Sequence, residues 1–269
     1  MRILLLGVIL LCQLTPAAAQ LFKKPKYSGI YIQWGYNREW YTKSDLHFSN
    51  GSSYDFTVKK ARATDSPDFD GFWETPLDIT IPQNSFRIGV YLNAEHTHAI
   101  ELNFDHAKYV VYDYQKLRVT GTVHGEHFDR DTVIQPSFLH FEHTDGANFW
   151  HINYVGQTLV RKNKKRTVAT AIYKAGAGLV VPRSDVSIMG RQLNNKFHVA
   201  GYIASIEAGL RYYPVRNLFL ELTAKTGYAN YLNALTVEGG TAKHQFGYFS
   251  VTGLVGYDLH FGKRRKAKA

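Results

Sequence analysis

The chain contains a single cysteine, Cys12, among its 269 residues. One thiol excludes a disulfide framework and any zinc site that needs several thiolates. Beyond the first segment there is no run of 18 apolar residues, so the sequence offers no transmembrane helix. Proline is scarce, at eight residues, whereas 14% of the residues are aromatic. This composition argues against a disordered chain.

The first 19 residues have the pattern of a secretion signal. Arg2 is followed by apolar residues at 3–11 and by an A-x-A pattern at 17–19. Nine apolar residues are too few for an anchor helix, which needs about 20. Cys12 lies inside this segment, and its lipid modification is the alternative to cleavage after Ala19. We predict a signal peptide at 1–19, a folded domain at 20–261 and a basic tail at 262–269.

Apolar and polar residues alternate with a period of two through most of the remaining sequence, which is typical of strands. Ile30, Ile32 and Trp34 share one face of the first such segment, while Tyr31 and Gln33 share the other. The short connections are 93–97, 161–166 and 213–217, and the long ones are 42–84, 113–147, 182–199 and 230–245. The eight predicted strands lie at 30–36, 86–92, 100–104, 150–154, 173–179, 202–212, 218–225 and 249–261.

An even number of antiparallel strands, with short turns at one end and long loops at the other, is the layout of an outer-membrane barrel. A soluble eight-stranded barrel of lipocalin type has alternating faces too and is the alternative. The secretion signal, the difference between turns and loops, and an aromatic last strand favour the membrane. The predicted fold class is therefore all-β: an eight-stranded antiparallel up-and-down transmembrane β-barrel with long extracellular loops.

The last predicted strand carries a resemblance to known proteins. Residues 256–261, GYDLHF, resemble the C-terminal signature of outer-membrane barrels, in which alternating apolar residues end in an aromatic one. Over residues 27–261 the pattern is similar to small eight-stranded barrels such as the OmpA-like transmembrane domain and the OmpX and OmpW families. The resemblance implies a fold and a place in the outer membrane, and it implies no activity.

The less apolar faces of the predicted strands carry charged residues, which an outer-membrane barrel turns inward. An eight-stranded barrel has room inside only for side chains, and an unpaired buried charge is costly. We therefore expect ion pairs that plug the lumen, with a gated narrow pore as the alternative. The face carries Arg87, Glu221 and Asp258 besides the six residues from which we predict the network: Glu101, Asp105, Lys174, Glu207, Arg211 and Lys225.

Two copies of a short pattern, HGEH at 124–127 and HFEH at 140–143, suggest a metal site. His124 and Glu126 would meet His140 and Glu142 if residues 117–123 and 132–139 paired as a hairpin. Two imidazoles and two carboxylates suit a divalent transition metal. A solvated, hydrogen-bonded loop explains the same residues without a metal, and we predict no cofactor.

An enzyme that modifies lipid A or phospholipid, such as a deacylase or an acyltransferase, is a second functional hypothesis. His47-Phe48-Ser49-Asn50 looks like the His-x-Ser-Asn stretch of the lipid A deacylase family, in which His activates Ser as the nucleophile. In that family the stretch lies on a late strand, whereas here it follows the first. A second candidate is His143 as a general base that Asp145 orients.

The long connections 42–84 and 113–147 exceed what a barrel needs, so we expect function there. Our first choice is a structural or interaction role, with outer-membrane lipids, lipopolysaccharide or another envelope protein as partner. The net charge of +10 first suggests a nucleic-acid binder. Sorted by the predicted topology, however, 14 basic residues and one acid fall on the short-turn side. This basic rim indicates periplasmic termini and no nucleic-acid partner.

Overall fold

The computed structural model describes residues 29–67, 83–163 and 166–260. The described chain folds into 17 strands joined by turns and contains no helix. None of the described residues therefore forms a helix that is long and apolar enough to cross a membrane. The predicted signal peptide at 1–19 and the tail at 262–269 lie outside the described residues.

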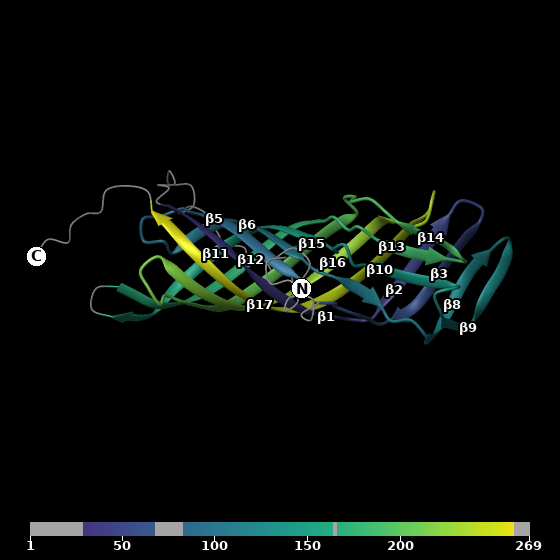
Figure 1. Ribbon diagram of the computed structural model, residues 1–269, viewed down its shortest axis with the longest axis horizontal. Helices are drawn as coiled ribbons and strands as arrows, with labels where there is room; N and C mark the ends of the chain where they lie inside the picture. Colours follow the sequence, from purple (N-terminus) through teal and green to yellow (C-terminus); the bar gives the residue numbers. More distant parts are fainter. Residues whose placement is uncertain (1–28, 68–82, 164–165, 261–269) are drawn as a thin grey trace, which may run out of the picture.

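Eight long strands form a closed ring, each antiparallel to the next (Figure 1). The ring closes where β17 pairs with the whole length of β1, from Gly29 opposite His260 to Tyr41 opposite Tyr248. The predicted eight-stranded antiparallel barrel is thus confirmed. The ring consists of β1 (Gly29–Tyr41), β5 (Asn84–Tyr91), β6 (His98–His106), β11 (Phe149–Asn163), β12 (Arg166–Val180), β15 (Gly201–Tyr212), β16 (Leu218–Leu235) and β17 (Thr241–His260).

Along the strands of the ring, large apolar side chains point outward, and the charged side chains of the alternating positions point inward. Successive side chains of a strand lie on opposite faces, so the period of two in the sequence becomes two distinct surfaces. The outward side chains are large and well exposed, which is the reverse of a water-soluble barrel. They include Ile32, Phe86, Ile100, Leu102, Ile152, Tyr173, Leu179, Tyr202, Ile206, Leu210, Leu220, Leu222, Val255 and Tyr257.

The long connections predicted at 42–84 and 113–147 are present, but their described residues form further strands instead of irregular loops. Leu46 and Phe48, and then Phe56 and Val58, alternate with polar residues just as the barrel strands do, and all four are buried. The nine additional strands are β2 (Ser44–Asn50), β3 (Tyr54–Ala61), β4 (Ala63–Thr64), β7 (Tyr109–Val111), β8 (Gln115–Val123), β9 (Glu126–Ile134), β10 (Leu139–His143), β13 (Asp185–Ile188) and β14 (Arg191–Asn194).

The expected loop at 230–245 is also mostly strand, because β16 continues to Leu235 and β17 begins at Thr241. Together with the nine additional strands, the ends of β16 and β17 form a second body beyond one end of the ring, which we call the extension (Figure 1). The opposite end, where the short connections lie, is called the turn end.

Within the one 17-stranded sheet, the strands of the extension form two facing groups. One contains the first residues of β17 with β2, β3, β8 and β9, and the other contains β4, β7, β10, β13 and β14. Apolar side chains fill the space between the two groups. Phe48 of β2 meets Phe141 of β10 edge to face, with ring centroids 5.2 Å apart. The extension therefore has a hydrophobic core of its own.

Two tight turns close hairpins at the far end of the extension. Val123 pairs with Glu126 across His124 and Gly125, and both turn residues have positive φ, at 49° and 82°. Ile188 pairs with Arg191 across Met189 and Gly190 in the same way. Two-residue turns with two positive φ values match the twist of the flanking strands, which is why a glycine stands at the second position.

Candidate functional site

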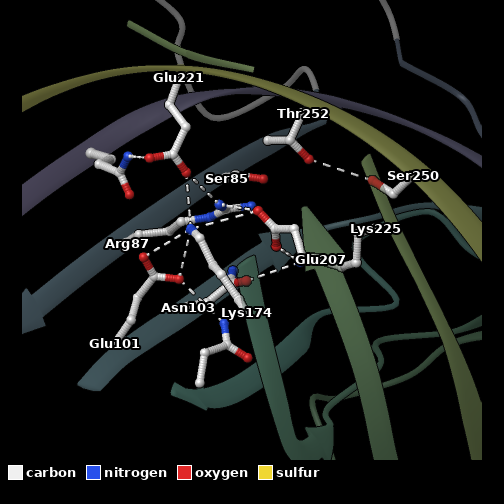
Figure 2. A network of polar contacts seen from close by, with 12 residues as sticks. Ser85, Arg87, Glu101, Asn103, Lys174, Glu207, Glu221, Lys225, Ser250 and Thr252 are labelled. Atoms are coloured by element: carbon white, nitrogen blue, oxygen red, sulfur yellow. Dashed lines mark hydrogen bonds and ion pairs between the residues drawn. The ribbon is translucent and has the colours of Figure 1, made fainter. Parts of the chain in front are cut away.

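The lumen of the barrel holds a network of buried charges, drawn in Figure 2. Its members stand at inward positions of β5, β6, β12, β15 and β16, so the alternation of each strand brings them to one place. Four cations meet four carboxylates, and each of the eight residues is at most 4% exposed. The network contains Arg87, Lys174, Arg211, Lys225, Glu101, Asp105, Glu207 and Glu221.

Glu221 of β16 is one of two carboxylates with three cationic partners, and Glu207 is the other. Its Oε1 lies 2.9 Å from Nζ of Lys174 and 3.2 Å from Nη1 of Arg87. Its Oε2 lies 2.7 Å from Nη2 of Arg211 and accepts a hydrogen bond from Nε2 of Gln33 at 2.7 Å. One carboxylate thereby holds side chains from four other strands.

The remaining three carboxylates complete the network. Nη1 of Arg87 lies 2.6 Å from Oε1 of Glu207, and Nζ of Lys174 lies 3.0 Å from Oε2 of Glu101. Lys225 pairs with Asp105 and lies 3.6 Å from Glu207. Since the four cations and four carboxylates balance, no net charge remains within this network.

Aromatic side chains close the lumen at the turn end. Tyr31, Tyr91, Tyr213 and Phe219 form a buried cluster there. The guanidinium of Arg211 lies 4.0 Å from the ring centre of Phe219, and the hydroxyl of Tyr31 donates to Glu101 at 2.7 Å. These contacts connect the aromatic cluster to the charges. At the other end of the barrel, the lumen continues into the hydrophobic core of the extension.

The structure places all six residues of the predicted network in the lumen. Ion pairs link five of them directly, and Arg211 is connected to the others through Glu221. The structure adds Arg87 and Glu221, which lie at the centre of the network and were left out of the prediction. Both stand on the same inward face that the alternation had already identified, so this signal would have found them. Asp258 stands apart from the network and accepts a hydrogen bond from Tyr91 at 2.7 Å.

His47 and Ser49 lie on β2, on the face of the extension that points away from its core. Nε2 of His47 is 2.9 Å from Oδ1 of Asp55, which is exposed on β3. In the strand register, Ser49 stands directly opposite Asp55. A hydroxyl, an imidazole and a carboxylate therefore share one solvent-facing patch, and Asp55 is a member that sequence reasoning missed.

The expected pair of His143 and Asp145 is corrected by the structure. His143 lies in the core of the extension, with Nδ1 2.8 Å from Oγ of Ser184 and Nε2 3.1 Å from Nε2 of His244. Asp145 instead pairs with Arg183 at 3.4 Å and accepts a hydrogen bond from Asn194. Burial lowers the pKa of His143 to about 3, so this imidazole is neutral at physiological pH. Asp145 does not orient it as a base.

The proposed metal ligands are not brought to one point. His124 lies in the β8–β9 turn, whereas His140 and Glu142 lie on β10, which pairs with β13 and β7. Among the residues that the structure describes, no group of three or more His, Cys, Asp or Glu is arranged to hold a metal ion. The first two residues of the HGEH pattern, His124 and Gly125, form the turn between β8 and β9.

His140 has carboxylates at both ring nitrogens. Nδ1 lies 3.0 Å from Asp113 and Nε2 lies 3.4 Å from Glu142. The hydrogen bond to Glu142, together with Asp113, raises the pKa of His140 to about 9 against the effect of burial. Because the two carboxylates sit at opposite ends of the ring, they cannot bind one metal ion together with it. The imidazolium instead joins β10 to the segment before β8.

No family model and no curated protein sequence matches the chain. Among solved structures, Neisserial surface protein A is similar at 8% identity and a TM-score of 0.40, over 85% of this chain and 96% of that one. OprG from Pseudomonas aeruginosa is similar at 10% identity and a TM-score of 0.44, over 88% and 99%. The outer membrane protease OmpT from Escherichia coli is similar at 9% identity and a TM-score of 0.41, over 87% and 97%. These likenesses concern architecture alone.

Proposed function

We propose that the chain is an integral outer-membrane barrel that conducts no solute and that displays the extension as a contact surface outside the cell. The observation that carries this proposal is the lumen network. Four cations and four carboxylates fill the interior of the barrel, each within ion-pair distance of a partner. A barrel of eight strands has no space beside such side chains for a solute path.

The outward face of the ring supports a place in a bilayer. Ile152, Ile206 and Leu222 are 64%, 63% and 62% exposed, and their neighbours around the ring are equally apolar. Such a belt is costly in water, since soluble monomers rarely expose apolar patches of more than a few hundred Å². In a bilayer the same belt meets lipid chains, and all barrel strands satisfy their backbone groups around the closed ring.

The extension supports an interaction role, because its strands pack around a hydrophobic core and present a defined surface instead of irregular loops. A groove where β2, β16 and β17 meet has Lys43, Asp45, Tyr231, Leu232 and Lys243 in its lining, with one more cation than carboxylate. Two lysines beside an apolar wall suit a phosphorylated lipid headgroup of the outer leaflet, such as that of lipopolysaccharide. Another envelope protein that docks on the extension is the alternative partner.

Conductance in planar bilayers tests the closed lumen. We expect purified protein to insert without stable current steps, with insertion verified separately by protection of the barrel from protease. Stable channels in the nanosiemens range would overturn the proposal.

The double variant Lys43→Gln/Lys243→Gln tests the groove. We expect less lipopolysaccharide to be retained after purification, and unchanged retention would exclude lipopolysaccharide as the partner in this groove.

A lipid-modifying enzyme is a second candidate, favoured by the patch of His47, Ser49 and Asp55. In this hypothesis Asp55 orients His47, and His47 takes the proton of Ser49 as its hydroxyl attacks the ester carbonyl. The C–O bond of the ester breaks, the alcohol leaves with the proton from His47, and water then hydrolyses the acyl group from Ser49. Mass spectrometry of envelope lipids from cells with the wild-type chain, with Ser49→Ala and without the gene decides the matter. An identical acylation pattern in all three would exclude this activity.

A further inference from the structure

At the turn end, β11 and β12 continue past their neighbours in the ring. The last pair of β11 with β6 is Gly156 opposite His98, and the last pair of β12 with β15 is Ala169 opposite Tyr212. Residues 158–163 and 166–167, which we call the hairpin tip, have no third described strand beside them and are all exposed. Figure 1 shows the tip projecting beyond the described turns between β5 and β6 and between β15 and β16.

The hairpin tip is cationic. It carries Arg161, Lys162 and Arg166, and Arg216 lies in the neighbouring β15–β16 turn. Nη1 of Arg166 donates to the carbonyl of Pro214 at 2.9 Å, which joins the two turns into one surface. No described carboxylate forms an ion pair with these four cations. The sequence has no acidic residue at all between Asp145 and Asp185.

Apolar side chains stand among these cations. Leu159, Val160 and Val215 are 54%, 59% and 55% exposed. A register shift leaves Val160 without a partner on β12, and a bulge of this kind turns a side chain away from its regular direction. A soluble polyanion would match the charges and leave the apolar side chains in water. A surface that is anionic at its boundary and apolar beneath it matches both.

The depth of the hairpin tip in a bilayer can be judged from the nearby tyrosines. Tyr173, Tyr212 and Tyr257 are exposed on the outside of the ring toward this end, and tyrosine belts mark the level where lipid chains meet headgroups. Arg166 lies three residues beyond Ala169, the partner of Tyr212, or about 10 Å along the strand. Since barrel strands tilt by about 35–45°, the displacement along the membrane normal is smaller. The headgroup layer is roughly 5–8 Å thick.

We propose that the hairpin tip, with Arg216, binds the phosphate-bearing headgroups of anionic glycerophospholipids in the adjacent, inner leaflet. The proposal rests on the membrane embedding proposed above. The cations lie at the depth of the phosphates, and Val160 and Leu159 lie at the edge of the lipid chains. The contact recruits anionic lipid around one side of the barrel and fixes how deep that side sits.

The test uses the full chain in nanodiscs of phosphatidylethanolamine and phosphatidylglycerol in equal amounts. The lipids that remain bound on release are measured by native mass spectrometry. We compare the wild type with Arg161→Gln/Lys162→Gln/Arg166→Gln. The matched control removes three exposed cations of the extension, Lys116→Gln/Arg191→Gln/Lys196→Gln. Because one basic residue near an anionic surface changes binding roughly fivefold, we expect the hairpin variant to lose at least tenfold of its phosphatidylglycerol enrichment. The control keeps it.

Each outcome has one meaning. Enrichment that is equal in wild type and hairpin variant, or that falls as much in the control, overturns the proposal. Loss of enrichment on addition of inorganic phosphate, at constant ionic strength, shows a site for free phosphate and overturns the lipid assignment. If the triple variant does not insert, the single variant Lys162→Gln is measured, with a roughly fivefold loss expected. Failure of the wild type to insert overturns the proposed membrane function and the hairpin assignment that rests on it, whereas insertion without enrichment overturns the hairpin assignment alone.

Discussion

The barrel and the extension are filled by opposite kinds of side chain. Both are closed by antiparallel strands, and β17 runs through both with one unbroken alternation. In the barrel its inward residues include Ser250 and Thr252, whereas in the extension they include His244 and Phe246. The interior of the barrel is ionic and that of the extension is aromatic, although the strand and its periodicity are the same.

The difference follows from what lies outside each body. Where the outer face is apolar, the polar half of the alternation has to turn inward, and its charges must pair because an unpaired buried charge is costly. Where the outer face is polar, as on β2 with His47 and Ser49, the apolar half fills the interior. The barrel interior therefore depends on partners that match one by one, and the extension interior depends on volume and burial.

The largest effect should come from breaking the ionic interior at Glu221. Glu221→Ala removes the carboxylate shared by Arg87, Lys174 and Arg211 and leaves their charges buried with too few partners. We expect the free energy of unfolding to fall by about 3–5 kcal/mol. Urea unfolding of the barrel in lipid vesicles, followed by the loss of heat-resistant mobility in gels, measures this change.

A neutral double substitution sharpens that prediction. Glu221→Met together with Arg211→Met removes one charge of each sign and keeps side-chain volume in the lumen. Since replacing a buried ion pair by apolar residues is often neutral, we expect the double variant to be more stable than Glu221→Ala. A double variant that unfolds as readily as Glu221→Ala would show that the individual contacts of Glu221, and not charge balance, govern the stability of the lumen.

Acid should act on the extension through His143. The pKa of this buried imidazole is lowered to about 3 in the folded chain, against an ordinary value of about 6.5. The folded state then binds fewer protons between these values, so stability falls as the pH drops from 6.5 toward 3, by at most about 1.4 kcal/mol per pH unit. The groups that face His143 are His244, Ser184, Tyr109, Tyr231 and Phe141, none of which is a carboxylate.

Hydrogen exchange of the β10 amides between pH 7 and pH 4.5 measures this effect, after correction for the intrinsic exchange rates. We expect protection of β10 to decrease on acidification. The variant His143→Gln has an amide in place of the titrating ring. The change of its β10 protection with pH should be smaller than in the wild type by the contribution of one proton. An unchanged slope would mean that other groups open the extension in acid.

Alkali should act on the same strand with the opposite sign, through His140. Its hydrogen bond to Glu142, with Asp113 at the other ring nitrogen, raises the pKa of His140 to about 9. The folded state binds more protons between 6.5 and 9, so this contribution is complete below pH 6.5 and is lost as the pH rises to 9. The effect should be smaller than that of His143, because His140 is partly exposed and solvent screens it. His140→Gln should flatten β10 protection between pH 6.5 and 9, and a slope like that of the wild type would contradict the assignment.

The barrel was predictable from the sequence because its signal is local. Each strand is recognisable by its period of two. The same pattern places Arg87 and Glu221 on the inward faces of their strands. The composition of the network was less accessible. The pairing of carboxylates with cations depends on the stagger between strands that are far apart in the sequence. Arg87 of β5 and Glu207 of β15 form one such pair. The alternation fixes the face of a side chain and leaves its height in the lumen open.

The extension was less predictable. Several of its strands are short, and a strand of four or five residues, such as β13 or β10, resembles a loop when read alone. β9 has nine residues, but its residues do not alternate regularly between buried and exposed. The partner of His143 is another histidine, His244, 101 residues away, so the proximity of Asp145 in the sequence does not identify it. The HGEH pattern suggested a metal, while the positive φ of His124 shows that a turn sets its position.

The smallest effect should come from an ion pair on the surface of the extension, which is the counterpart of those in the lumen. Nε of Arg118 lies 2.8 Å from Asp129, a distance like those around Glu221, but both side chains are about half exposed. Water already solvates both charges, so Arg118→Ala should lower the free energy of unfolding by less than about 1 kcal/mol, and less still at high salt. Urea unfolding of the extension at low and high NaCl measures this change. A loss as large as that of Glu221→Ala would show that pairing itself, and not the removal of charges from water, sets the two interiors apart.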